Sequence, residues 1–329
     1  MKVLVTGGAG FIGSTVASAC IDSGITPVIV DDLSTGRREF VADRVFYGGD
    51  IADRTLIRRI FDDHADIAAV VHCAAKIVVP ESMERPLDYY DNNVAKTIVL
   101  VDELLAHRLE RFIFSSSASI YAPNADFTVD ESSQLDPKSP YAMTKLMVER
   151  ILEDVARATS LRVLSLRYFN PIGADPQRRT GLQTARPTHA LGKLIEAFET
   201  GTPFTVTGTG WPTRDGSAIR DYIHVWDLAL AHVAALQRFD ASVPAAGYQV
   251  VNIGAGTGTT VRELVAAFRS VAGDLEVREA GPRPGDVVGC YTTSAKAAEL
   301  LGWKAVKTLD EGVRDSLEWA ELRPSVLGN

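Results

Sequence analysis

The stretch Gly7-Gly8-Ala9-Gly10-Phe11-Ile12-Gly13 decides the fold of this chain. It follows a short apolar run and opens a stretch with helical periodicity. Gly7 permits a tight turn, Gly10 lets the backbone approach a pyrophosphate, and Gly13 lets the helix pack closely on the strand. A pyrophosphate would lie at the helix N-terminus, where free N–H groups and the helix dipole favour anions. The stretch therefore predicts a dinucleotide-binding turn.

An acidic pair follows this turn at a distance that fits cofactor recognition. Asp31 ends the second predicted strand, about 20 residues after the glycines, where its carboxylate could accept a hydrogen bond from a ribose 2′-hydroxyl. With Asp32 it would repel a 2′-phosphate, so NAD is predicted rather than NADP. Arg37 and Arg38 favour NADP, but they lie beyond the strand end. A glycine turn with a capping aspartate is the structural alternative.

Short apolar runs alternate with stretches of helical spacing throughout the first half of the chain. Strands are predicted at Lys2–Val5, Pro27–Val30, Arg44–Tyr47, Ala68–His72, Arg111–Ser115 and Arg162–Leu166. Helices are predicted at Phe11–Ser23, Thr55–Asp63, Pro86–His107 and Tyr141–Ala158. This alternation predicts an α/β fold with a doubly wound parallel sheet of the Rossmann type.

The regular alternation ends after Asn170. A loop is expected at residues 171–187 and an irregular segment at 208–220. Further elements are expected at His189–Thr200, Phe204–Val206, Trp226–Phe239, Tyr248–Ile253, Val261–Val271, Ser294–Leu301 and Asp310–Glu321. No linker separates two domains. We therefore predict an NAD-binding domain (1–170 with about 221–254) and a smaller, interwoven α/β substrate-binding domain (about 171–220 with 255–329).

Composition narrows the class of protein. The 329 residues include 34 Lys and Arg against 42 Asp and Glu, a formal net charge of −8, which argues against nucleic acid as a partner. No apolar run approaches the roughly 20 residues that span a membrane, and we expect no secretory signal. Three widely spaced cysteines give no disulfide framework. We expect a cytoplasmic protein without a membrane segment.

Tyr141 and Lys145 lie one turn apart on one face of a predicted helix. A tyrosine with a pKa near 10 is a poor base at neutral pH, but an adjacent ammonium and a positive nicotinamide ring would favour the phenolate. Ser115-Ser116-Ser117 ends the fifth predicted strand, where doubly wound sheets bind ligands. A serine hydroxyl there could relay a proton between substrate and phenolate. The structural alternative is an ordinary amphipathic helix face.

These motifs resemble the extended short-chain dehydrogenase/reductase family, and within it the UDP-glucose 4-epimerases. The resemblance covers nearly the whole chain. The matching stretches are Gly7–Gly13, Asp50-Ile51, His72–Ala75, Asp88–Val94, Ser115–Tyr121, Ser139–Lys145, Leu166–Ala174, Trp211–Val225, Asn252–Gly256 and Arg283–Asp286. The stretches around Asn170 and at Trp211–Val225 are the most specific to 4-epimerases.

The resemblance implies a reaction. Tyr141 would take the proton from the sugar 4-hydroxyl while hydride passes from C4 to NAD, with Ser117 relaying the proton. Lys145 would lower the tyrosine pKa and bind the nicotinamide ribose. The 4-keto intermediate would turn in the pocket and receive the hydride on its other face. Because no net redox change occurs, NAD should stay bound.

The resemblance also implies two sets of binding residues. The cofactor would contact Gly7, Gly10, Phe11, Ile12, Gly13, Asp31, Asp32, Leu33, Ser34, Thr35, Gly36, Asp50, Ile51, Cys73, Ala74, Ala75, Lys76, Ile77, Asn92, Ser115, Tyr141, Lys145 and Phe169. The UDP-sugar would contact Ser117, Tyr141, Asn170, Thr188, His189, Thr205, Val206, Thr207, Arg220, Arg283, Asp286 and Cys290. Arginine suits the diphosphate because its planar fork engages phosphate oxygens in pairs. No metal site is expected.

Three departures from the family pattern qualify these assignments. The lysine that some members carry at Ile77 is here Lys76, one position earlier. His189 replaces part of an Asn-Leu pair and is interpreted as a pocket-lining or helix-capping residue. Cys290 stands where the family has a bulky tyrosine or a small residue associated with N-acetylated sugars. We therefore hypothesise activity on UDP-GalNAc and UDP-GlcNAc; a small buried cysteine is the structural alternative.

Other functions remain open. A 4,6-dehydratase is disfavoured because Ala118-Ser119 replaces its Asp-Glu pair. A 4-epimerase of a UDP-pentose or UDP-uronate is the first alternative, and a non-catalytic NAD-sensing regulator is the second. The resemblance also implies a homodimer through the helices at Pro86–His107 and Tyr141–Ala158.

Overall fold

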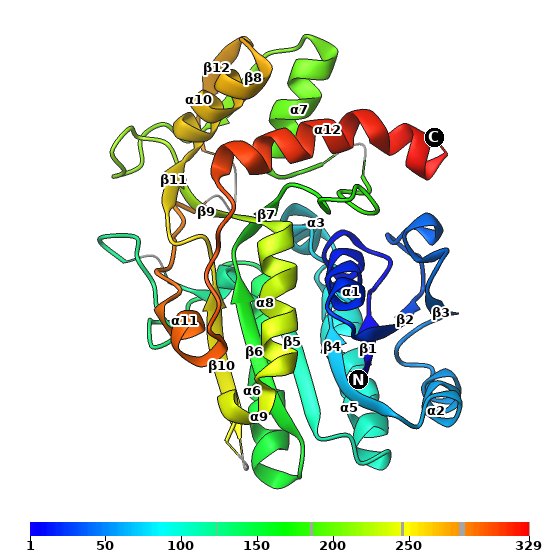
Figure 1. The fold of residues 1–329 in the computed structure, drawn as a ribbon. Coiled ribbons are helices and arrows are strands. Elements are labelled where there is room, and N and C mark those ends of the chain that lie inside the picture. The colour runs from blue at the N-terminus through cyan, green and yellow to red at the C-terminus, as the bar shows by residue number, and fades with distance from the viewer. Residues whose placement is uncertain (123, 185–186, 245–246, 283–286, 329) are drawn as a thin grey trace.

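The computed structural model describes residues 1–122, 124–184, 187–244, 247–282 and 287–328, and Figure 1 shows its fold. A seven-stranded parallel sheet runs through its centre in the order β10-β6-β5-β4-β1-β2-β3. Its strands are β1 (Lys2–Thr6), β2 (Thr26–Asp31), β3 (Val45–Gly48), β4 (Ile67–His72), β5 (Arg111–Ser117), β6 (Arg162–Tyr168) and β10 (Tyr248–Ile253). The predicted fold class is confirmed.

Helices cover both faces of this sheet (Figure 1). The helices and short turns of the first half are α1 (Phe11–Asp22), η1 (Arg38–Val41), α2 (Arg54–Asp63), α3 (Val79–Glu84), α4 (Pro86–Tyr90), η2 (Asp91–Ala95), α5 (Lys96–Ala106), η3 (Ala118–Ile120) and α6 (Pro140–Ala158). Those of the second half are α7 (Ala190–Thr200), α8 (Val225–Gln237), α9 (Phe239–Ser242), α10 (Val261–Ala272), α11 (Ala295–Leu301) and α12 (Leu309–Leu327).

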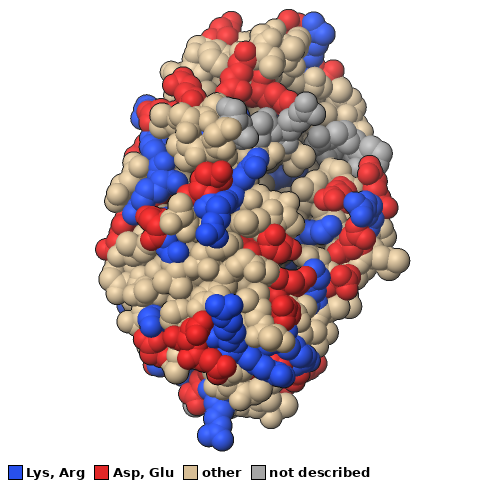
Figure 2. Space-filling model, turned by 90° about the vertical axis from the view of Figure 1, so that its right-hand side faces the viewer, with Lys and Arg blue, Asp and Glu red and all other residues tan. Residues whose placement is uncertain are grey.

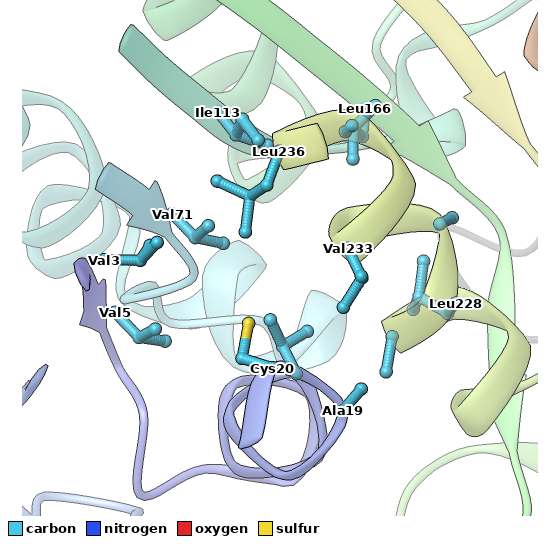
Figure 3. Packing of buried hydrophobic residues seen from close by; sticks show 14 of the residues in the cluster. Val3, Val5, Ala19, Cys20, Val71, Ile113, Leu166, Leu228, Val233 and Leu236 are labelled. Atoms are coloured by element: carbon cyan, nitrogen blue, oxygen red, sulfur yellow. The ribbon is translucent and has the colours of Figure 1, made fainter. Parts of the chain in front are cut away.

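The core is divided by the sheet into two apolar layers. Val3 and Val5 of β1 face α1 and α8, and Figure 3 shows this layer closing around Cys20 and Leu228. Leu4, between the two valines, faces the opposite layer with α2, α5 and α6. Because both faces are covered, strands such as β1 and β4 carry consecutive apolar residues rather than alternating ones, which is typical of parallel sheets.

Smaller elements gather beyond one end of the sheet (Figure 1). They are β7 (Asn170–Ile172), β9 (Ile219–His224) and β11 (Gly258–Thr260) in one sheet, and β8 (Phe204–Thr207) and β12 (Val277–Ala280) in another. A separate apolar cluster joins them to α7, α10 and α12. The division of the chain into two domains stays a prediction.

The sequence missed some local features. The helix predicted over Pro86–His107 is interrupted by a π-helical turn at Asp91–Ala95. Inside this turn the Asn93 amide holds the Lys76 backbone, with distances of 2.8 Å from the Lys76 N–H to Oδ1 and 3.0 Å from Nδ2 to the Lys76 oxygen. A contact 17 residues away in the chain leaves no trace in hydrophobic periodicity. Among the described residues, no helix is both long and apolar enough to cross a membrane.

Candidate active site

The backbone packs too tightly around Gly7 and Gly13 for either residue to carry a side chain. Gly7 has a φ of +67°, and a Cβ there would lie 2.6 Å from the Ala74 nitrogen. A Cβ on Gly13 would lie 2.2 Å from the Gly7 carbonyl oxygen. Gly10 caps α1, and a Cβ there would meet only the Gly7 oxygen, at 3.4 Å. The open space at Gly10 and the bare N-terminus of α1 fit the pyrophosphate of a dinucleotide.

Asp31 ties the end of β2 to this turn. Its carboxylate accepts N–H bonds from Ala9 (2.9 Å) and Leu33 (2.8 Å), and burial raises its pKa. The Arg37 N–H donates to the Ala9 oxygen, so the segment between them folds against the glycines. That segment holds the predicted cofactor residues Asp32, Leu33, Ser34, Thr35 and Gly36. The structure thus brings the predicted ribose and pyrophosphate residues together.

Tyr141 and Ser117 meet at the carboxyl end of β5. Tyr141 lies in the first turn of α6, and both side chains are buried. Burial raises the pKa of Tyr141, and the hydrogen bond from Ser117 opposes that rise. The Ser117 Oγ also lies 2.9 Å from Ser119 Oγ, so its single proton can go to either oxygen. Ser117 and the phenol of Tyr141 therefore lie side by side, and the role of Ser117 as a proton relay stays a prediction.

Lys145 lies one turn further along α6 and is buried. Its ammonium donates to the Ser115 carbonyl oxygen at 2.7 Å and lies 4.9 Å from the centre of the Phe114 ring. Burial lowers the pKa of Lys145 to about 8. The bond to the end of β5 fixes the ammonium near the predicted nicotinamide side, while its predicted effect on the Tyr141 pKa stays a prediction.

The remaining predicted cofactor residues surround the same edge of the sheet. Asp50 is paired with Lys96 at 2.5 Å, next to the buried Ile51. Cys73 begins the loop after β4, and its sulfur lies 3.2 Å from Ser115 Oγ. The loop continues through Ala74, Ala75, Lys76 and the exposed Ile77. Asn92 lies in the π-helical turn, and Phe169 follows β6.

The predicted substrate residues come from several short elements. Asn170 begins β7, while Thr205, Val206 and Thr207 form most of β8. Thr188 is exposed, and the next residue, His189, caps α7 by accepting the Gly192 N–H at 3.2 Å. The interpretation of His189 as a helix-capping residue is confirmed. Burial lowers its pKa to about 4, so the imidazole is neutral.

Arg220 and Cys290 lie on neighbouring segments. The Arg220 guanidinium donates to the carbonyl oxygens of Val287 (3.0 Å) and Val288 (2.8 Å). Cys290 packs against an apolar cluster that contains Phe169, and burial raises its pKa to about 11. Two predicted residues, Arg283 and Asp286, lie outside the residues that the structure describes.

Two residues of this site escaped the sequence prediction. The Tyr222 hydroxyl on β9 is buried and has no hydrogen-bond partner within the described part of the chain. Such an orphaned group two residues from Arg220 fits a site for a polar ligand. Asp221, between them, accepts N–H bonds from Ala255 (2.7 Å), Gly256 (3.3 Å) and Thr292 (3.3 Å). Both residues stand in the Trp211–Val225 motif, so their position in that motif was the available signal.

A glycine turn beneath a buried tyrosine, lysine and serine defines an enzyme of the dinucleotide-dependent Rossmann class. Residues 3–254 match the NAD dependent epimerase/dehydratase family, and the chain belongs to that family. Over 322 residues it is 42% identical to a UDP-glucose 4-epimerase of Azospirillum brasilense, covering 97% of this chain and 91% of that protein.

Solved structures agree with this assignment. A UDP-glucose 4-epimerase of Stenotrophomonas maltophila, with bound NAD and formylated UDP-arabinopyranose, has a TM-score of 0.92 at 35% identity and covers 98% of each chain. One from Bifidobacterium longum, in complex with NAD⁺ and UDP, has a TM-score of 0.89 at 34% identity and covers 99% of this chain and all of that one. The predicted family, NAD cofactor and epimerase class are confirmed.

Proposed function

We propose that the protein interconverts UDP-galactose and UDP-glucose by inverting C4 of the sugar through a transient 4-keto intermediate. The observation that carries this proposal is the buried set of Tyr141, Ser117 and Lys145 at the carboxyl end of β5. It is supported by the relatives described above, all of them UDP-glucose 4-epimerases.

Each member of this set has a distinct task. Tyr141 accepts the proton of the sugar 4-hydroxyl and later returns it, and Ser117 carries the proton between sugar and phenol. Lys145, held by the Ser115 carbonyl, orients the nicotinamide ribose and adds positive charge near the phenol. When bound, NAD supplies reversible hydride chemistry at C4.

The two halves of the site bind different ligands. Gly7–Gly13, Asp31 and the loop after β4 hold the cofactor in the larger domain. The smaller domain binds the UDP group through the β8 backbone and Arg220, with Tyr222 as a further donor. The local positive charge of arginine offsets the diphosphate despite the net charge of −8. Arg283 and Asp286 are proposed to complete this half.

We propose that Cys290 admits N-acetylated sugars, because a small side chain beside Phe169 leaves room that a tyrosine would fill. In Cys290→Tyr, turnover of UDP-GalNAc should fall at least about tenfold, the usual scale of pocket-size discrimination. Turnover of UDP-galactose should stay within about threefold of wild type. Steady-state assays of both sugars measure this, and equal effects on both would contradict the proposal.

A UDP-pentose is the second candidate substrate. The Stenotrophomonas maltophila structure contains formylated UDP-arabinopyranose, and its fold matches this chain with a TM-score of 0.92. Parallel assays of UDP-galactose, UDP-GalNAc and UDP-arabinopyranose decide between the candidates. The proposal requires UDP-galactose to react at least as fast as the pentose; a strong preference for the pentose would overturn it.

We also propose a cytoplasmic homodimer without a nucleic-acid partner. All three cysteines are unpaired, as is usual in a reducing compartment. On the face shown in Figure 2, basic and acidic side chains are interspersed, unlike a nucleic-acid interface. Exposed apolar side chains on the helices of the predicted dimer interface, among them Leu87, Ile98 and Met147, support self-association.

A further inference from the structure

The buried carboxylate of Glu149 lies on the same face of α6 as Tyr141 and Lys145. Tyr141, Lys145 and Glu149 are spaced by four residues, so they lie along one face of the helix. Glu149 accepts a bond from Ser116 Oγ at 2.5 Å and is gripped by the Arg167 guanidinium, with Nη2 to Oε2 at 2.6 Å. These bonds attach α6 at Glu149 to both β5 and β6.

Tyr121 extends this network away from α6. Arg167 Nη1 donates to the Tyr121 hydroxyl at 2.8 Å, and that hydroxyl donates to Asn252 Oδ1 at 2.7 Å. A guanidinium can only donate, so the single phenol proton must go to Asn252. Burial raises the pKa of Tyr121 to about 12, which keeps this proton in place at neutral pH.

The chain of contacts ends in the substrate half of the site. With its oxygen facing Tyr121, the Asn252 amide turns its Nδ2 toward Thr292 Oγ1, 3.4 Å away. The Thr292 N–H in turn donates to Asp221, the neighbour of Arg220. Thr292 also lies two residues after Cys290. Six residues, namely Glu149, Arg167, Tyr121, Asn252, Thr292 and Asp221, thus connect α6 to the segments proposed to hold the UDP-sugar.

The ring of Tyr121 contributes separately. It belongs to the apolar cluster formed with Ala118, Val129 and Phe169, against which Cys290 packs. The ring therefore forms part of the wall between the two halves of the site, while its hydroxyl joins their polar networks. Both properties belong to one residue outside the relay proposed for Tyr141 and Ser117.

We infer that Tyr121 is a positioning residue that sets the sugar-binding segments at the correct distance from Tyr141. This rests on the proposed function. Misplacement of reacting groups by about 1 Å can cost about a hundredfold in rate, so a loosened connection should lower kcat more than binding. The residue acts through Arg167 and Asn252.

Tyr121→Phe tests this inference because it removes only the hydroxyl. We expect kcat for UDP-galactose to fall about tenfold, with the dissociation constant of UDP within about twofold of wild type. Expressing kcat per titrated UDP site removes the effect of any unfolded fraction. Tyr248→Phe is the matched control, because Tyr248 lines the same cavity as Glu149 and Arg167 but lies outside the chain of contacts.

A double variant tests the connection itself. Adding Asn252→Ala to Tyr121→Phe should cause less than about a twofold further loss if both residues act through one chain, whereas independent effects would multiply. A kcat per UDP site that is normal in Tyr121→Phe, or multiplicative losses, would overturn the positioning role alone. Failure of the wild type to turn over UDP-galactose would overturn the proposed function and this inference together.

Discussion

Burial shifts the pKa values of Tyr141 and Lys145 in opposite directions, and both shifts favour the uncharged side chain. The pKa of Tyr141 is raised above its usual value of 10.0, and that of Lys145 is lowered to about 8. At neutral pH the phenol of Tyr141 is therefore uncharged in the protein alone, whereas Lys145 is still mostly protonated. The Ser117 hydrogen bond favours the phenolate, and positive charge brought into the site with the cofactor would favour it further.

Tyr141→Phe should reduce turnover of UDP-galactose by about a thousandfold, within the range that general acid–base groups contribute. Because burial raises the Tyr141 pKa, wild-type kcat/KM should rise with pH until Lys145 loses its charge near its pKa of about 8. The variant should lack this rise and retain its bound NAD. Tyr47→Phe, at a half-buried phenol that donates to Asp63, serves as the control. Activity in Tyr141→Phe above a tenth of wild type would contradict the role.

The positions of single site residues could be predicted where the residues belong to a motif whose spacing indicates a reaction. The spacing of Tyr141 and Lys145 and the serines that end β5 were sufficient to place them together. The partner of Lys145, a backbone oxygen of β5, could not be predicted, because it depends on how α6 packs on the sheet. Asp221 was missed for the same reason, since its three donors come from two distant segments.

At the scale of elements, two glycines in the turn between β1 and α1 differ in role: Gly13 allows the helix to pack on the strand, and Gly10 leaves space for the cofactor. A Cβ on Gly13 would lie 2.2 Å from the Gly7 carbonyl oxygen, so the helix must shift away from the strand. A Cβ on Gly10 meets nothing closer than 3.4 Å, and its φ of −84° suits any residue. The two glycines therefore serve different purposes although they stand in one motif.

Gly10→Ala should fold normally but lose bound NAD, because its methyl group occupies the space of the pyrophosphate. Gly13→Ala should lose NAD and also stability, by about 1–3 kcal/mol, as overpacked sites do. Thermal melting and the absorbance of cofactor released on denaturation measure both effects. Equal stability losses in the two variants would disprove this division of roles.

Elements with strong apolar patterns were predicted from the sequence, and those without them were not. The ends of all seven strands of the central sheet lie within two residues of their predicted positions. The strands β7 and β11, of three residues each, and β9 were missed, because pairing with distant segments creates them. The π-helical turn was missed because hydrophobic periodicity does not reveal it or the contact that Asn93 makes from it with Lys76.

At the scale of the whole molecule, the proposed dimer can be tested by a substitution on its predicted interface. Leu87 on α4 is 79% exposed, and Met83 and Ile98 nearby are also exposed. Leu87→Glu should convert the expected dimer to a monomer in sedimentation analysis, since a buried, unpaired charge is costly at an interface. Val306→Glu, at a 76% exposed side chain outside these helices, should remain dimeric. A monomeric wild type would refute the dimer.

The arrangement of the whole molecule explains why two ligands can meet. The sheet presents the glycine turn and Tyr141 at one edge, and the smaller elements gather beyond that edge (Figure 1). This topology supports the proposal that the cofactor site and the sugar site face each other. The fold class followed from the alternating pattern, whereas the pairing of the small sheets did not.

The most direct test of the central claim is a ¹H NMR time course of UDP-galactose with the purified protein in D₂O, without added NAD. We expect conversion to UDP-glucose with protium retained at C4, because that hydrogen leaves and returns as hydride rather than exchanging with solvent. Deuterium at C4, or no conversion by protein that holds NAD, would contradict it.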